Sequence, residues 1–318
     1  MLRYVIKRSI YAVPTLLLII FAVFMLLHLV PGDPAQVMLG VGASEGEISA
    51  LREKLGLNKP IIVQFARYVA GVLRGDLGDS FAYRKEVIRV VSERFPATLE
   101  LTFAAMLLAC GIGIPLGVES SLRQHSSFDF VCRVIALIGV SFPVFWLAIQ
   151  LMYLFAVILH LFPLSGRGGA LYTWNGLSHI ILPAVALSSI MLPSTMRLTR
   201  SSMLEVLTQE YITVARSKGL REVVVVYKHA LKNAIIPVIT NIGLQFGMLL
   251  GGAFLTEHVF AWPGIGQLTV NAIFRRDFPV VQGVILITAL AFLVLNILVD
   301  ISYAYFDPRV RHEMVKST

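Results

Sequence analysis

Six stretches of the sequence are largely apolar, about 20 residues long, and free of Asp, Glu, Lys and Arg, which is what an α-helix needs to cross the hydrocarbon core of a bilayer. They cover residues 9–30, 101–118, 134–155, 177–196, 234–256 and 278–299. The composition agrees, because 57% of the 318 residues are hydrophobic and only 14% are charged, which excludes a water-soluble globule. We therefore expect an all-α, polytopic membrane protein with six transmembrane helices.

The formal net charge of +8 does not indicate a nucleic-acid partner, because so apolar a chain leaves no exposed surface on which a phosphate-binding patch would dominate. Cys110 and Cys132 have no His or Cys near them at metal spacing, so neither a disulfide framework nor a metal site is expected. The first apolar run exceeds the h-region of a signal peptide and has no cleavage site after it, so we interpret it as an uncleaved first span.

Lysine and arginine are distributed asymmetrically among the flanks of these runs. They gather before the first run, between the fourth and fifth, and after the sixth, whereas the short loops on the other side carry Arg167, Arg275 and Arg276. By the positive-inside rule, both termini and the 197–233 loop are expected in the cytoplasm. The long segment 31–97 is then expected outside.

The 31–97 segment carries signals for two helices. Ser44 and Glu47 have the spacing of a capping box before an apolar periodicity, and Gly56 suits the left-handed stop after it. Pro60 opens a second periodic stretch that ends near Gly75. These helices are predicted to lie at the membrane surface or to pack on the bundle.

The sequence offers little for an enzyme. Residues 139–142 read Gly-Val-Ser-Phe and echo the Gly-x-Ser of intramembrane serine proteases, with His160 or His179 as a distant partner of Ser141, but a small-residue helix contact is the simpler interpretation. There is no HExxH and no P-loop, so any ATP that drives this protein would bind, with its Mg²⁺, to another subunit.

The 197–233 loop is long, cationic and has the pattern of a helix. Met203, Leu207, Tyr211 and Val214 recur on one stripe, and Gly219 directly after a lysine suits a helix stop. Such a stripe needs a covering partner. The alternative is that the helix packs on its own bundle or on lipid headgroups.

The fifth apolar run carries polar groups. Thr240, Asn241 and Gln245 lie close together, and Asn241 and Gln245 share one helix face, so they are candidates to line a translocation path or to hydrogen-bond another helix. A small-residue seam suited to close helix contact lies opposite them and consists of Gly243, Gly247 and Gly251.

The run EYITVARSKGL over residues 210–220, followed by KHALKNA over 228–234, resembles the EAA loop of ABC-importer permeases of the dipeptide/oligopeptide (peptide/nickel) transport family. Ala215, Gly219 and Leu231 match the general pattern. His229 and Lys232 replace its isoleucine and proline, and this departure is the one that the peptide-type subfamily shows.

Motifs in other parts of the chain resemble the same family. They are VPGDP at 30–34, GDLGDS at 75–80, FAWPGIG at 260–266 and DPR at 307–309. Glu86 stands where the family usually has proline. The resemblance covers the whole chain and implies a single transmembrane permease domain over 1–318 with the type I ABC importer permease fold.

The resemblance implies a transport subunit rather than an enzyme, placed in the cytoplasmic (inner) membrane of a prokaryote and moving di- or oligopeptides by alternating access. Nickel and glutathione are alternative cargoes within the family. The implied partners are a second homologous permease, two ATP-binding subunits and an extracytoplasmic substrate-binding protein, and no cofactor is expected in this chain. The residues implied to contact an ATP-binding subunit are Glu210, Tyr211, Val214, Ala215 and Gly219.

Overall fold

The computed structural model describes residues 2–29, 33–40 and 42–306. In that part of the chain, five helices are long and apolar enough to cross a membrane, and a bent helix pair makes six if it counts as one span. The five cover Tyr11–Leu29, Val87–Leu122, Trp174–Leu207, Glu222–Gly251 and Phe278–Val299. The prediction of an all-α membrane protein with six transmembrane spans is confirmed, with the bent pair as one of the six.

The third predicted span is not one continuous helix. Helix α6 (Ser127–Ser141) and helix α7 (Val144–Leu151), which continues as the π-helix η1 (Met152–Ile158), meet at an angle of 102°. Pro143 has no N–H to donate, and the residue before a proline is pushed out of the helical region, as the extended backbone of Phe142 shows. The third predicted span is therefore divided into two helices at Pro143.

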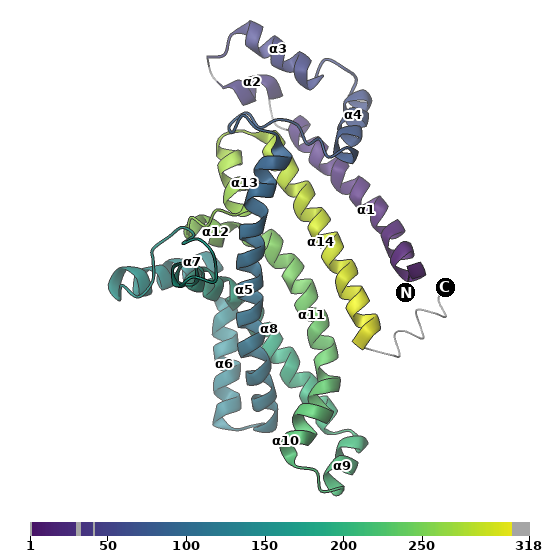
Figure 1. Cartoon of the computed structure of the whole chain (residues 1–318), viewed down its shortest axis with the longest axis vertical. Helices are drawn as coiled ribbons and strands as arrows, with labels where there is room; N and C mark the ends of the chain where they lie inside the picture. The colour runs from purple at the N-terminus through teal and green to yellow at the C-terminus, as the bar shows by residue number, and fades with distance from the viewer. Residues whose placement is uncertain (1, 30–32, 41, 307–318) are drawn as a thin grey trace. The chain divides into compact units, whose positions relative to one another are not determined.

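The chain divides into two compact units. The first, called here the N-terminal unit, comprises residues 2–98 and 263–294. It holds α1 (Leu2–Leu29), α2 (Pro34–Leu39), α3 (Glu45–Leu55), α4 (Ile61–Leu73), the beginning of α5 (Val87–Leu122), α13 (Ile265–Phe274) and most of α14 (Phe278–Phe306) (Figure 1).

Both helices predicted in the 31–97 segment are present. Ser44 is the N-cap of α3 and forms the reciprocal capping box with Glu47, and Gly56 ends the helix at a φ of 69°. Pro60 precedes α4, and Gly75 follows it with a φ of 78°. The sequence reasoning did not predict α2 or α13.

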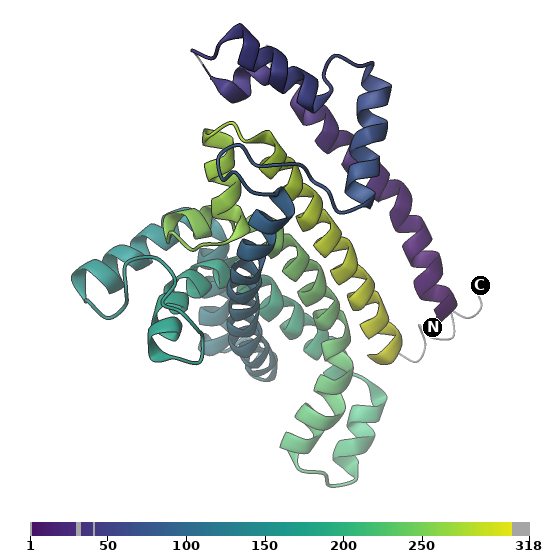
Figure 2. The same ribbon diagram turned by 45° about the horizontal axis from the view of Figure 1, so that its top comes forward.

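Helix α4 packs along α1 in the N-terminal unit (Figure 2). Phe65 and Tyr68 of α4 pack against the cluster that Ile20 and Val23 of α1 form with Leu286 of α14. A second cluster joins the start of α5 to α13 and α14 and comprises Val87, Val90, Val91, Ile265, Leu268, Ala272, Val280 and Val284. Close van der Waals packing of these apolar faces holds the helices of the unit together, since lipid is as apolar as the side chains themselves.

The second unit, called here the bundle unit, comprises residues 99–262 and 295–306 of the described chain. Helix α8 (Trp174–Leu207) contacts α6, α7 and α11 (Leu231–Gly252). It is the most buried of the five candidate spans. Short elements complete the unit, namely α9 (Glu210–Ser217), α10 (Glu222–Val224), the π-helix η2 (Val225–Ala230) and α12 (Phe254–Val259).

Glycines on α5 allow it to approach α8 closely. A Cβ on Gly117 would lie 2.6 Å from the Met196 carbonyl oxygen and 2.7 Å from Thr199 Cβ, and one on Gly113 would lie 3.2 Å from the Leu192 carbonyl oxygen. Only glycine fits so near a neighbouring backbone, so this small-xxx-small pair fixes the contact of the two helices.

Candidate functional site

Between α8 and α11, the predicted coupling loop forms three short helical elements, α9, α10 and η2, at one end of the bundle unit. Figure 1 shows α9 and α10 side by side near the N-terminal end of α11, whereas α12 follows its C-terminal end. Helix α8 continues to Leu207. The helical conformation is then interrupted at Thr208 and Gln209, and α9 begins at Glu210. The four residues of the predicted stripe, Met203 to Val214, therefore lie on two different helices. The sequence has no glycine or proline between them, so nothing in it indicated that the helix ends at Leu207.

Helix α9 has one buried face. Ile212 and Ala215 lie at 0% and 7% exposure in a cluster with residues of α5, α8, η2 and α11. The other members of that cluster are Val118, Met203, Val225, Val226, Ala230 and Ala234. This face of the helix packs on its own bundle, as the alternative interpretation expects, and Ala215 is buried there.

The opposite face of α9 is open. Glu210, Val214 and Ser217 share it at i, i+4 and i+7, and all three are exposed. Tyr211 lies at the edge of this face, where its hydroxyl accepts a hydrogen bond of 2.7 Å from Asn233 Nδ2 of α11. The apolar side chains exposed on and beside α9 are Tyr211, Val214, Leu220, Val223 and Tyr227.

The turn after α9 is closed by a glycine and an ion pair. Gly219 has a φ of 72° and donates its N–H to the Arg216 carbonyl oxygen, and a Cβ there would meet nothing within 4 Å. Arg216 donates from Nε and Nη2 to the two carboxylate oxygens of Glu222, at 3.2 and 2.7 Å, which raises the pKa of the guanidinium. This bidentate pair joins α9 to α10 across the turn.

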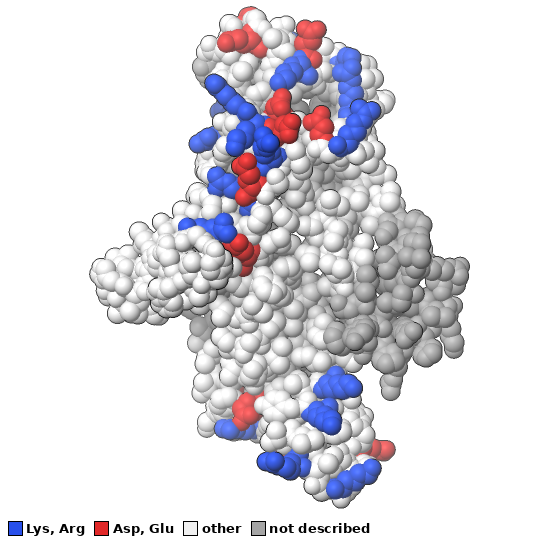
Figure 3. Space-filling model, viewed as in Figure 1, with Lys and Arg blue, Asp and Glu red and all other residues white. Residues whose placement is uncertain are grey.

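Cations surround the open face of α9. Figure 3 shows Lys and Arg side chains gathered over α9 and α10. The exposed cations of this region are Arg216, Lys218, Arg221, Lys228 and Lys232. This end of the bundle unit therefore combines a few exposed apolar side chains with a positive rim.

A buried ion pair that the sequence reasoning missed lies near the coupling loop. Asp129 of α6, which is fully buried, accepts hydrogen bonds from Arg200 Nε at 2.7 Å and Arg200 Nη2 at 2.9 Å. The Ser120 hydroxyl and the His125 backbone N–H also donate to it, and Arg133 lies 3.6 Å away.

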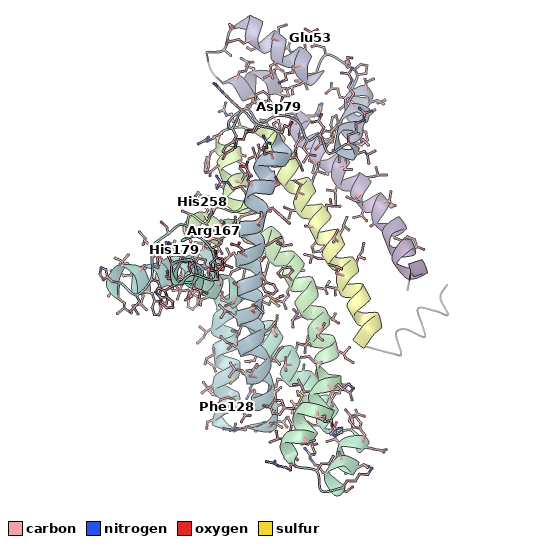
Figure 4. The ribbon with its side chains drawn as sticks, in the orientation of Figure 1. Glu53, Asp79, Phe128, Arg167, His179 and His258 are labelled. Atoms are coloured by element: carbon pink, nitrogen blue, oxygen red, sulfur yellow. The ribbon has the colours of Figure 1, made fainter. Side chains whose placement is uncertain are left out.

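The Asp129–Arg200 pair joins α8 to the hairpin between α5 and α6, where Phe128 is labelled in Figure 4. Arg200 stands two helical turns before the end of α8, and Met203 on the next turn already belongs to the cluster under α9. One indication of this pair was present in the sequence, because Asp129 is a charged residue between apolar neighbours in the run Phe-Asp-Phe-Val over 128–131. Its partner is 71 residues away.

The three candidate path residues on α11 have different surroundings. Gln245 Nε2 donates to the Ser194 hydroxyl of α8 at 2.6 Å, which is the helix-to-helix bond of the alternative interpretation. Thr240 donates to the Ile236 carbonyl oxygen of its own helix. Asn241 Nδ2 is enclosed and, within the described residues, has no hydrogen-bond partner.

The glycine seam on α11 has one close contact. A Cβ on Gly243 would clash with Val299 Cγ2 of α14, whereas one on Gly251 would meet no described residue within 4 Å. The seam thus permits close approach at Gly243, where the end of α14 lies within the same unit.

The residues of the protease alternative do not come together. The Ser141 hydroxyl donates to the Leu137 carbonyl oxygen, His160 Nδ1 contacts the Ile158 carbonyl oxygen, and His179 Nδ1 contacts the Asn175 carbonyl oxygen. Each side chain is bonded within its own segment. The DPR motif at 307–309 and most of the first motif, at 30–32, lie outside the described residues.

The structure is that of a helical, multi-pass membrane protein, and sequence comparison places it in a family. The model of the binding-protein-dependent transport system inner membrane component matches residues 89–312, and the N-terminal model of the same kind of component matches residues 1–102. The chain belongs to this family of inner-membrane permease components.

Full-length relatives support the same assignment. The chain is 43% identical to the dipeptide transport system permease protein DppB of Alkalihalophilus pseudofirmus, with 98% of this chain and 100% of that protein covered. It is 41% identical, with the same coverage, to DppB of Escherichia coli K12 and to the glutathione transport system permease protein GsiC of Salmonella typhimurium. The resemblance to dipeptide-type ABC permeases predicted from the loop is confirmed.

A solved structure shows the same fold. A chain of the MetNI methionine ABC transporter in an inward-facing conformation matches with a TM-score of 0.55 and 16% sequence identity, covering 69% of this chain and 96% of that one. The predicted permease fold is therefore present.

Proposed function

We propose that this protein is the permease subunit of an ATP-driven importer that carries di- and oligopeptides into the cell by alternating access. It pairs with a second homologous permease and with two ATP-binding subunits, and an extracytoplasmic binding protein delivers the cargo. The observation that carries the proposal is the full-length identity of 41–43% to permeases of dipeptide transport systems.

The geometry of α9 supports the coupling part of the proposal. A lever transmits displacement only if it is anchored on one side and free to contact a partner on the other. Ile212 and Ala215 anchor α9 in the bundle unit, and the Asp129–Arg200 pair fastens α8 close to that anchor. The contact with an ATP-binding subunit is then made by Glu210, Val214 and the edge of Tyr211, with Gly219 shaping the turn. Ala215 supports this contact from beneath.

Glutathione is the second candidate cargo. It is favoured by the 41% identity to a glutathione permease, nearly equal to that of the dipeptide permeases. Uptake of labelled dialanine and labelled glutathione into the same proteoliposomes, each with its own binding protein, separates the two.

The coupling role is tested by changing Gly219. Valine at a φ of 72° costs about 1–2 kcal/mol, and among the described residues no atom beyond the two chain neighbours lies within 4 Å of the added Cβ, so the effect is confined to the turn. We expect Gly219→Val to reach the membrane normally while the ATP-binding subunits co-purify poorly or hydrolyse ATP without moving cargo.

Gly219→Asn is the matched control, because asparagine tolerates the left-handed conformation. It should retain co-purification and uptake. Normal co-purification and normal uptake by the valine variant would show that the loop is only a solvated connection.

The proposed orientation has both termini in the cytoplasm and the 31–97 segment outside. Cysteines introduced at Ser49 of α3 and Ser217 of α9, in a chain whose two native cysteines are replaced by alanine, report on it. In intact cells an impermeant maleimide should label only the first. Labelling of both from outside would contradict the orientation.

A further inference from the structure

The N-terminal unit contains a cavity of about 680 Å³ between α1, α3, α4, the 74–86 stretch and the start of α14. This volume lies within the range of small-molecule sites, roughly 300–1,000 Å³. Apolar side chains line part of it, among them Phe24, Leu55, Leu77 and Phe81. The rest of the lining is polar or charged, which is unusual for a surface that serves only to pack helices.

Six charged side chains line the cavity, three of each sign: Lys54, Arg67, Arg74, Asp76, Asp79 and Glu86. Lys54 and Asp79 form an ion pair of 3.1 Å with each other. Figure 3 shows both signs interspersed over the surface of this part of the unit, and Figure 4 labels Asp79.

In the described part of the chain, four of these charges are not neutralised by an ion pair, although Asp76 Oδ1 accepts a hydrogen bond of 2.9 Å from the Gly78 N–H. Within the described residues, Arg67, Arg74, Asp76 and Glu86 form no ion pair with one another or with other groups. Their charges sum to zero, so the cavity favours neither a simple anion nor a simple cation. It suits a ligand that carries one group of each sign, because each group can then meet its opposite charge.

Tyr68 adds an unsatisfied donor beside the cavity. It is a lining residue, and its hydroxyl is enclosed and has no hydrogen-bond partner among the described residues. A buried hydroxyl without a partner is destabilising, because it has lost its hydrogen bonds to water and gained none in the protein. If the Tyr68 side chain rotates toward the cavity, its hydroxyl can donate a hydrogen bond to an oxygen of the ligand, which satisfies the donor.

We propose that this cavity binds a short peptide in its zwitterionic form. The peptide carboxylate meets Arg67 and Arg74, and its ammonium group meets Asp76 and Glu86. This inference rests on the proposed function, since it takes the cargo to be a peptide and the 31–97 segment to be extracytoplasmic. It adds a binding station on the permease itself, before the membrane path.

The test is equilibrium binding of radiolabelled dialanine to the purified transporter complex, without nucleotide and without binding protein. N-acetyl-dialanine lacks the ammonium charge, and dialanine amide lacks the carboxylate. We expect dialanine to bind and each blocked form to bind at least about tenfold more weakly, since each loses a charge-assisted contact.

Two variants assign the residues. Arg67→Gln/Arg74→Gln should raise the dialanine Kd about tenfold or more and leave the already weak binding of dialanine amide unchanged. Both arginines are exposed, so the fold does not depend on their charges. Tyr68→Phe should weaken binding severalfold without lowering thermal stability, because the hydroxyl has no partner to lose.

Arg84→Gln/Arg89→Gln is the matched control, since both arginines are exposed nearby but do not line the cavity. It should bind dialanine like the wild type. The proposal is overturned if the wild-type complex does not bind dialanine, if the amide binds as well as the free peptide, or if the cavity variant behaves like the control.

The proposed function is judged separately, by uptake of dialanine into proteoliposomes that contain the complete wild-type system. If the wild-type system takes up dialanine but Arg67→Gln/Arg74→Gln does not change dialanine binding, only the proposal that the cavity binds the peptide is refuted. Absence of uptake removes the peptide cargo and the zwitterion proposal with it.

Discussion

Replacing Arg200 by methionine tests whether the buried ion pair holds the α5–α6 hairpin on α8. Methionine keeps the length of the side chain and removes the charge. The Asp129 carboxylate is fully buried and receives two of its hydrogen bonds from Arg200, whose side chain is only 18% exposed. Arg133 does not replace it, because it lies 3.6 Å away and is half exposed.

The expected cost is large. Removing one partner of a buried ion pair destabilises a protein by about 3–5 kcal/mol, since the other charge stays behind without compensation. This corresponds to a factor of about 10² to 10³ or more in the ratio of folded to unfolded protein. Asp129→Asn should cost less, because an amide in place of the carboxylate still accepts hydrogen bonds from its neighbours and the remaining Arg200 is partly solvated.

The assay is the midpoint of unfolding of the purified protein in mixed micelles titrated with SDS. Arg197→Met is the matched control, three residues earlier on the same helix and exposed, and it should stay within about 0.5 kcal/mol of the wild type. The double variant Asp129→Asn/Arg200→Met should be more stable than the sum of the single effects predicts. Equal midpoints for Arg200→Met and Arg197→Met, or strict additivity, would refute the reasoning.

Three further predictions concern other contacts. Gly117→Ala should lower thermal stability by about 1–3 kcal/mol, because its Cβ meets α8 at 2.6 Å, whereas Gly111→Ala, with nothing within 4 Å, should not. Gln245→Leu should lower stability by about 1 kcal/mol with normal uptake per assembled complex, while Asn241→Leu should change uptake without lowering stability. The hydrogen bonds from the N-cap serine lower the pKa of Glu47, so helix α3 is stabilised above the unfolded pKa and loses that contribution as the pH falls through the folded value. Amide hydrogen exchange in α3 should quicken at low pH, and Glu47→Gln should abolish this dependence.

Local patterns in the sequence determined most of the fold class. The length and polarity of the apolar runs predicted the spans, because a bilayer tolerates only backbone whose hydrogen bonds are satisfied within the segment. The capping box at Ser44 and the left-handed stop at Gly56 were also predictable, since each depends on residues within one helical turn. The loop around Gly219 identified the family in the same way.

Other features depended on residues that are far apart in the chain. Periodicity shows that α9 has an apolar face, but only packing decided that Ile212 and Ala215 turn inward while Val214 stays exposed. The Asp129–Arg200 pair connects residues 71 positions apart, and the Gln245–Ser194 bond connects residues 51 apart.

The sequence by itself therefore determined where most of the long helices lie, which segments are apolar enough to span a membrane, and which family the loop belongs to. The tertiary structure decided where the third span bends, which face of α9 is free, and which charges are buried together. The cause is physical: hydrogen bonding within a helix and apolar length are properties of neighbouring residues, whereas ion pairs, close glycine contacts and cavities arise only where distant segments meet.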